Sequence, residues 1–240
     1  MATSTPPLHT RSKKATDVNR ARTVVDLSHP IGAGMITYPG LPGPEMTDHL
    51  TREEAEQVYG PGVTFQIGRI SLVGNTGTYL DSPYHRFAGG PDLADLAVDR
   101  LADVEGIVVR ITGSDHRGVD VAALEPFHVA GRAVLIHTGW DRHWGTPKYG
   151  QEAPFVTAAA AHWLADHPPA LVGIDSVNID DATDPARPAH TILLGAGIPI
   201  VEHLCRLDQL PPTGFRFTAA PPAVQRFGTF PVRALAVIDA

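Results

Sequence analysis

Apolar residues occur along the chain in short runs that are separated by glycine, proline and polar turn residues. Several of these runs are rich in β-branched side chains, which is typical of strands that are buried on one or both faces of a sheet. We therefore predict strands at residues 23–31, 63–73, 106–111, 133–139, 171–177, 198–204, 215–221 and 232–238.

Helical patterns are fewer. The alanine-rich segment Thr157–His167 begins with a threonine that can cap a helix, and Pro168-Pro169 ends it. Shorter helices are expected at Thr51–Gln57 and from Val119 onward. Strands outnumber helices, and we find neither an internal repeat nor a linker. The pattern predicts a single α/β domain over residues 22–240, with a mixed sheet or closed, barrel-like core and flanking helices.

The first 21 residues differ from the rest because they are polar and contain no apolar stretch. Basic residues occur among them at Arg11, Lys13, Lys14 and Arg20. This segment lacks the hydrophobic middle of a secretory signal, and we expect a disordered tail at residues 1–21. Elsewhere, no apolar run reaches the length of about 18 residues that a membrane-spanning helix needs.

Charge and cysteine content narrow the classes of function. A formal net charge of -7 and a pI near 5.9 leave no basic excess for binding nucleic acid or an anionic membrane surface. The single cysteine, Cys205, has no partner for an intramolecular disulfide, which favours a reducing compartment. We expect a cytoplasmic protein that acts on a small molecule, with no nucleic-acid or membrane partner.

The densest cluster of chemically active residues is NTGTYLDSPYH, at Asn75–His85. In an extended backbone alternate side chains share a face, so Tyr79 and Asp81 should point the same way. The turn after Asp81 should then return His85 to them. An aspartate in such a place also commonly serves only as a turn residue. Convergence of a carboxylate with an imidazole favours a catalytic site.

A second carboxylate lies in an apolar context. Glu202 stands within the strand predicted at 198–204, where alternation places it on the same face as Ile198 and Ile200. Burying an unpaired carboxylate is costly, so Glu202 needs a partner such as a metal ion or His190.

The segment Asn75–His85 resembles the signature H-x-G-T-H-x-D-x-P-x-H of the cyclase family, which includes bacterial kynurenine formamidase and isatin hydrolase. Further segments resemble other blocks of that family in the same order, and together they extend from Thr23 to Asp239: DLSHPI, YPG, IHTGW, VGIDSVNID and HTILLGAGIPIVEHLCRLDQLP. The resemblance implies the swivelling β/β/α fold of the family and a homodimer or homotetramer.

In the cyclase family the motif histidines and aspartate, with a later histidine and glutamate, hold one or two divalent metals, usually zinc or manganese. The resemblance implies metal ligands at four positions of this chain: Asp81, His85, His190 and Glu202. The first two motif histidines are replaced here by Asn75 and Tyr79. A carboxamide is a weak ligand, and a phenol with a pKa of about 10 binds well only when ionised. A single zinc or manganese ion is therefore expected.

The leading functional hypothesis is a cyclase-family hydrolase that cleaves a C–N or C–O bond of an amide, imide or lactone in a small cyclic or N-acyl compound. A divalent metal would activate water, and Tyr79, with Asn75 nearby, would donate a hydrogen bond to the developing oxyanion. The alternative is a metal-independent cyclase, isomerase or lyase of a secondary-metabolite pathway, with His85 and Asp81 as base and orienting group and Tyr79 as acid. A third hypothesis is an inactive relative that is kept for binding.

Other residues have two interpretations each. Aromatic side chains near the predicted loops either form a wall for a planar substrate or seal the core: Tyr38, Phe87, Trp140, Trp144 and Phe155. Asp175 and Asp180 either orient the site or belong to an ordinary turn at the end of a strand. His29 either lines the site or caps a turn, and no feature singles out His203.

Overall fold

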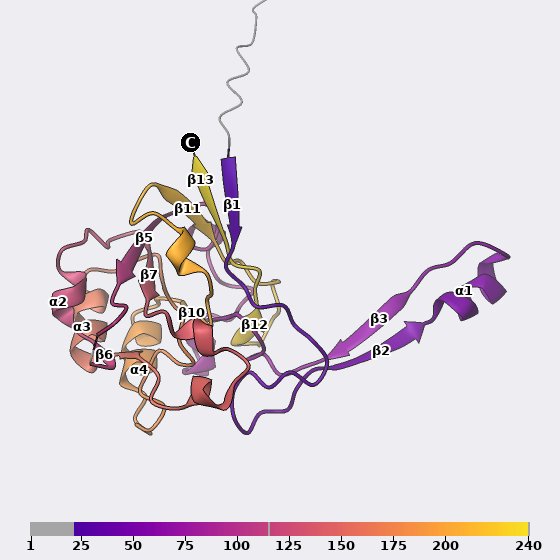
Figure 1. Cartoon of the computed structure of the whole chain (residues 1–240), viewed down its shortest axis with the longest axis horizontal. Coiled ribbons are helices and arrows are strands. Elements are labelled where there is room, and N and C mark those ends of the chain that lie inside the picture. Colours follow the sequence, from indigo (N-terminus) through magenta and orange to yellow (C-terminus); the bar gives the residue numbers. More distant parts are fainter. Residues whose placement is uncertain (1–21, 115, 240) are drawn as a thin grey trace, which may run out of the picture.

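The computed structural model describes residues 22–114 and 116–239. Its main feature is a nine-stranded sheet with the strand order β1-β13-β11-β5-β7-β9-β10-β4-β12 (Figure 1). In chain order the strands are β1 (Arg22–Asp26), β4 (Tyr79–Asp81), β5 (Val104–Arg110), β7 (Ala133–His137), β9 (Leu171–Ile174), β10 (Ile200–Glu202), β11 (Phe215–Thr218), β12 (Thr229–Pro231) and β13 (Leu235–Asp239). Strands β5, β7, β9 and β10 pair in parallel, and the outer pairs are antiparallel.

The central strands are buried on both faces. On one face, Ile107 and Val109 of β5 pack in the core that contains helices α2 (Val121–Leu124), α3 (Ala158–Asp166) and α4 (Pro188–Gly195). Val108 faces the other way. On that second face the sheet curls, and Leu80 of β4 and Phe217 of β11 share one core although several strands separate them. The curled sheet thus encloses its core like half of a barrel.

These features confirm the predicted single α/β domain type, with a mixed, barrel-like sheet and flanking helices. Helices α1 (Arg52–Tyr59) and α3 occur where they were expected, and the hydroxyls of Thr51 and Thr157 cap them. The tail expected at residues 1–21 lies outside the described residues. Short elements complete the described chain: β6 (Gly118–Val119), β8 (Phe155–Val156) and 3₁₀ turns at Pro83–His85, Val98–Arg100, Trp140–His143, Pro147–Gly150 and Leu207–Gln209.

Some elements differ from the sequence-based expectation. β1 ends at Asp26, because the Asp26 carboxylate accepts the backbone N–H of Ser28 and the chain turns there. β10 covers only Ile200–Glu202, because His203 has a positive φ of 58°. α4, β12 and β2 (Glu45–Leu50) are elements that the sequence analysis did not predict. Within residues 22–114 and 116–239, no helix is long and apolar enough to cross a membrane.

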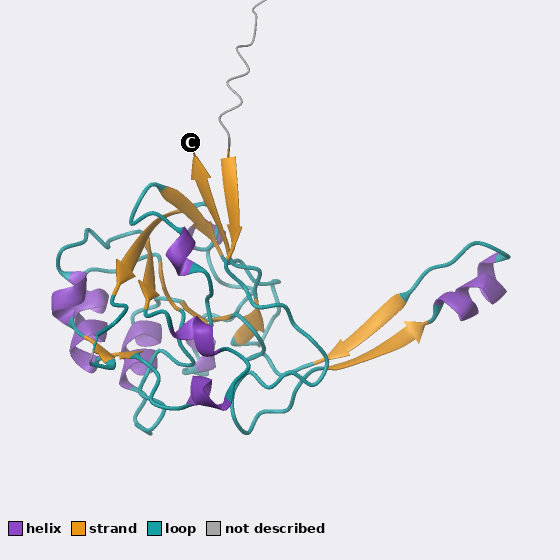
Figure 2. Ribbon diagram, viewed as in Figure 1, coloured by secondary structure: helices purple, strands orange, loops and turns teal. Residues whose placement is uncertain are grey.

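Residues 45–71 form an arm that projects away from the sheet (Figure 1 and Figure 2). The arm consists of β2, α1 and β3 (Ile67–Ser71), and its two strands pair antiparallel. Its exposed apolar side chains are Met46, Val58, Tyr59, Val63, Phe65, Ile67 and Ile70. An isolated two-stranded ribbon has little stability of its own in water. The described part of the chain therefore leaves the apolar surface of the arm uncovered.

The register of three neighbouring strands brings site residues together. β4 lies between β10 and β12, with Tyr79 opposite Glu202 and Asp81 opposite Thr229. Directly opposed residues of antiparallel strands have their side chains on the same face. The 3₁₀ turn Pro83–His85 follows β4 and returns the chain towards this face.

Candidate metal centre

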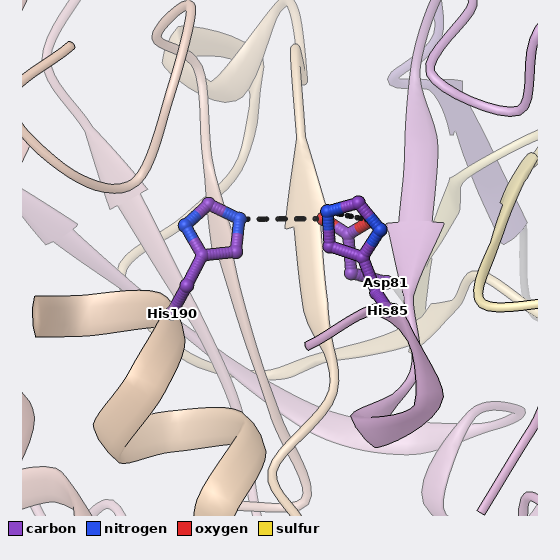
Figure 3. Close-up of side chains that lie close together, drawn as sticks. All are labelled: Asp81, His85 and His190. Carbon is purple, nitrogen blue, oxygen red and sulfur yellow. Dashed lines mark ion pairs between the residues drawn. The ribbon is translucent and has the colours of Figure 1, made fainter. Parts of the chain in front are cut away.

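Three side chains from separate elements meet beside β4. Asp81 ends β4, His85 ends the following 3₁₀ turn, and His190 lies in α4. One ligand atom of each residue lies within 4.8 Å of the other two, and Figure 3 shows the His190 ring facing Asp81 with the His85 ring next to the carboxylate. His85 Nε2 is 3.9 Å from Asp81 Oδ1, and His190 Nε2 is 3.7 Å from Asp81 Oδ2.

A hydrogen-bond chain orients His85. The hydroxyl oxygen of Thr229 is 2.5 Å from Asp81 Oδ1 and 2.8 Å from His85 Nδ1. Threonine has one hydroxyl hydrogen, so it donates to the carboxylate and accepts a hydrogen bond from Nδ1–H. The neutral His85 ring therefore has its lone pair at Nε2, on the side of Asp81.

Asp180 orients the second imidazole. Asp180 Oδ2 accepts a hydrogen bond from His190 Nδ1–H at 2.7 Å. The same carboxylate accepts the backbone N–H groups of Ala189 and His190, at 2.5 and 3.1 Å, and so caps the first turn of α4. A carboxylate behind the ring is the usual support for a metal-ligating histidine, because it directs the Nε2 lone pair.

The gap between these groups suits a cation. Asp81 is fully buried, and its Oδ2 atom has no hydrogen-bond partner among the described residues. Two imidazole nitrogens and a carboxylate are donors that zinc, manganese or iron accept. Ligands at about 2.1 Å from a tetrahedral ion are about 3.4 Å apart, close to the observed separations. The residues present therefore fit a divalent metal ion.

The buried carboxylates need a positive charge between them. Burial lowers the pKa of His190, but the carboxylates of Asp180, Asp81 and Glu202 outweigh burial and raise the pKa to about 10. The ring then keeps a proton at Nε2 and is itself the cation. A metal ion bound at Nε2 would replace that proton, because metal-ligating histidines are neutral.

Glu202 adjoins the three-residue cluster. Its side chain is buried, and its Oε1 atom lies 3.7 Å from His190 Nε2. Oε1 accepts the backbone N–H of Ile179 at 2.6 Å, and Oε2 accepts the hydroxyl of Tyr79 at 2.5 Å. Burial raises the pKa of Glu202 to about 7. Of the four ligands that the resemblance implies, the structure thus groups Asp81, His85 and His190 and places Glu202 beside His190.

The two positions where the family signature has histidines carry neutral groups. Burial, followed by the charges of Glu202 and Asp81, raises the pKa of Tyr79 well above its ordinary value, so the phenol keeps its proton. The Tyr79 hydroxyl donates a hydrogen bond to Glu202, and Asn75 lines the same cavity. A protonated phenol is a poor metal ligand, so this side of the centre has hydrogen bonds where the signature has imidazoles.

A further buried histidine lies behind Tyr79. His203 Nε2 is 3.4 Å from the Tyr79 hydroxyl, and His203 Nδ1 is 2.9 Å from the hydroxyl of Tyr149. Burial lowers the pKa of His203 to about 3, so the ring is neutral. Its ring makes an edge contact with Trp144, which stacks on His29. His203 therefore supports Tyr79, a role that no motif in the sequence indicated.

A cavity of about 300 Å³ opens onto the centre. The sequence-predicted residues Asn75, Tyr79, His85, His190 and Glu202 all line it. Its other lining residues are Tyr38, Leu41, Arg86, Asn178 and Arg187. Tyr38 thus reaches the cavity, and the cavity has a polar floor and a partly aromatic wall.

Several residues for which the sequence allowed two roles lie away from the centre and its cavity. Trp140 and Trp144 pack with Tyr149 in a separate cluster. Asp175 accepts hydrogen bonds from Thr138 and Gly139 and does not contact the centre, in contrast to Asp180. Thr229 was missed because its segment matches no motif, and only strand pairing brings it to Asp81.

The fold and the cluster define an α/β protein with a candidate divalent-metal centre at one end of a curled sheet. The model of the cyclase family matches residues 25–181, which is more than half of the chain and includes Asp81 and His85. The chain belongs to the cyclase family.

Individual relatives agree with this assignment. Kynurenine formamidase of Bacillus cytotoxicus is 27% identical over 217 residues, covering 90% of this chain and 98% of the relative. A structure from Bacillus stearothermophilus, described as a predicted metal-dependent hydrolase, is 27% identical with a TM-score of 0.72, covering 90% of this chain and 98% of the other. Isatin hydrolase A of Labrenzia aggregata, at 22% identity, shares the fold with a TM-score of 0.76 over 91% of this chain and 94% of its own.

Proposed function

We propose that this protein is a metal-dependent hydrolase that cleaves a C–N or C–O bond of an amide, imide or lactone in a small cyclic or N-acyl compound. The observation that carries the proposal is the convergence of two imidazole Nε2 atoms on the Asp81 carboxylate, His85 at Oδ1 and His190 at the unpartnered Oδ2, with both Nδ1 atoms held by hydrogen bonds. The names of the relatives, kynurenine formamidase and isatin hydrolase, support hydrolysis as the reaction.

The proposed division of labour follows from the contacts. Asp81, His85 and His190 would hold one divalent ion, zinc or manganese, with Glu202 as the adjoining fourth ligand. When bound, this ion lowers the pKa of water and polarises a carbonyl. Thr229 and Asp180 keep the two rings in the ligating tautomer. Tyr79 holds Glu202 through a short hydrogen bond, and Asn75 lines the cavity beside them.

Metal content and turnover test this function together. Protein purified without added ions should contain about one zinc or manganese per chain, and it should hydrolyse isatin or an N-formylated aromatic amine. His85→Ala and His190→Ala should each lose metal and activity. His162→Ala, a change at an exposed histidine of α3, should lose neither. A fully active protein without metal would refute the proposal.

One observation favours a second candidate, a metal-independent cyclase, isomerase or lyase. Two of the family's histidine positions are Asn75 and Tyr79, while Asp81, Thr229 and His85 already form a hydrogen-bonded chain that ends at the cavity. Such a chain can move a proton without a metal. Activity that survives complete metal removal and disappears in His85→Ala would favour this candidate over the hydrolase.

The assembly and location of the protein are part of the proposal. We infer a homodimer or homotetramer in which the arm, residues 45–71, packs against a second copy. The support is its exposed apolar surface, since apolar patches of this kind commonly mark protein interfaces. A cytoplasmic location is favoured by the lone thiol of Cys205, which is buried and free.

A further inference from the structure

Two arginines lie at the cavity beside the candidate metal centre. Arg86 directly follows His85, and Arg187 is the residue before α4, three positions from His190. Both line the cavity of about 300 Å³. Within residues 22–114 and 116–239, neither guanidinium forms an ion pair. The cavity therefore has two uncompensated positive charges in a chain whose formal net charge is -7.

Neutral groups hold both arginines in place. Arg187 donates to the carbonyl of Asp181 at 3.2 Å and to the hydroxyl of Tyr38 at 3.4 Å. Its backbone has a φ of 49°, a conformation that is uncommon for residues other than glycine and asparagine. Arg86 donates through Nε to the hydroxyl of Thr191 at 3.1 Å. Its terminal NH₂ groups make no hydrogen bond to a described residue.

The carboxylates of the centre do not use these arginines. Asp81 is bonded to Thr229, and Asp180 is bonded to His190 and the first turn of α4. Glu202 accepts from Tyr79 and from the backbone of Ile179. Both guanidinium groups therefore remain available to an anion that enters the cavity. Guanidinium groups bind carboxylates with strong, directional hydrogen bonds.

We propose that Arg86 and Arg187 bind the carboxylate of a small anionic substrate, so that its scissile carbonyl lies at the Asp81–His85–His190 cluster. The inference rests on the proposed function, because that function makes the anion-binding cavity a substrate site. Among amides, imides and lactones, it favours as substrates those that also bear a carboxylate. Tyr38 and Leu41, which line the same cavity, supply an apolar wall for the rest of the molecule.

Binding of benzoate and of its neutral analogue benzamide tests the inference without turnover. Calorimetry is done on the protein as purified and again after dialysis against a chelator, because a metal ion can itself bind a carboxylate. Wild-type protein should bind benzoate at least about tenfold more tightly than benzamide in both states. After dialysis against the chelator, Arg86→Gln and Arg187→Asn should each reduce this preference several-fold, and the double variant should remove it.

The variants are chosen to preserve the fold. Asparagine tolerates the positive φ at position 187, and Arg86 is exposed. Arg142→Gln is the matched control, because Arg142 is an exposed arginine that also donates to a carbonyl, that of Gly139, and does not line the cavity. It should leave the preference unchanged.

Two results would overturn the inference: no preference for benzoate in wild-type protein, or an unchanged preference in the double variant. The proposed function can fail separately. Protein that holds no metal and turns over no amide, imide or lactone, but keeps an arginine-dependent preference for benzoate, would refute the hydrolase and leave the carboxylate site standing.

Discussion

The hydroxyl of Thr229 orients two ligands of the candidate centre at once, since it donates to Asp81 and accepts from His85. Thr229→Val keeps the side-chain shape and removes both hydrogen bonds. We expect metal affinity to fall about 10- to 100-fold, because the His85 ring loses its fixed tautomer. Competition with a chromophoric chelator measures the change. Thr229→Ser should bind like wild type, and equal affinity in the valine variant would show that the hydroxyl has no such role.

The replaced histidines can be restored. Asn75→His with Tyr79→His returns two imidazoles to the side of the cavity that now has a phenol and an amide. The double variant should hold more metal than wild type, because neutral imidazole is a far better ligand than either group. Elemental analysis of dialysed protein gives the stoichiometry. Tyr79→Phe is the control, since it frees Glu202 without adding a ligand; if the double variant gains no metal, the alignment with the family signature is wrong.

The single cysteine gives a pH-dependent prediction. Burial raises the pKa of the Cys205 thiol from 9.0 to about 11. In the unfolded chain the thiol ionises first, so its contribution to stability is present below pH 9 and is lost as the pH rises towards 11. At pH 8 the native protein should react with a thiol reagent far more slowly than the urea-unfolded protein, which a chromogenic disulfide reagent measures. Equal rates in the two states would contradict the burial of Cys205.

Helix α4 is held in place by the same carboxylate that orients its histidine. Asp180 accepts two backbone N–H groups in the first turn of α4 as well as His190 Nδ1–H. Asp180→Ala should therefore lower the free energy of unfolding in urea by about 1–2 kcal/mol and weaken metal binding as well. Asp184→Ala removes a comparable turn contact, to the backbone of Ala186, without touching the centre. That control should leave metal affinity unchanged; if Asp180→Ala also does, Asp180 is only a helix cap.

The elements of the fold were predictable to different degrees. The central strands were found because their apolar runs are continuous, and α3 because Thr157 and a proline pair mark its ends. Alternation in β4 placed Tyr79 and Asp81 together, and the turn after it returned His85. α4 was missed because it is short and apolar on most sides, and its start depends on Asp180, which lies eight residues before it. Thr229 was not predicted, because only the long-range pairing of its strand with β4 brings it to the centre and no local pattern marks it.

At the scale of the whole molecule, the arm and the cavity are joined through the chain. Tyr38 and Leu41 precede the arm in the chain and Asn75 follows it, and all three line the cavity. The segments that lead into and out of the arm are therefore part of the cavity wall. Contacts that fix the arm against a second copy would also fix this wall, so the proposed assembly and the proposed site are physically linked.

Assembly is tested on the arm itself. Ile67 and Ile70 are each about half exposed on β3, where successive side chains point to opposite faces, so together they sample both faces of the ribbon. Ile67→Lys with Ile70→Lys should shift the protein from an oligomer to a smaller species, because charge replaces apolar contact at the interface. Light scattering coupled to gel filtration gives the mass. Val98→Lys, a change at an apolar side chain that is more exposed but lies outside the arm, should leave the mass unchanged. A monomeric wild type, or a double variant with the wild-type mass, would exclude the arm as the interface.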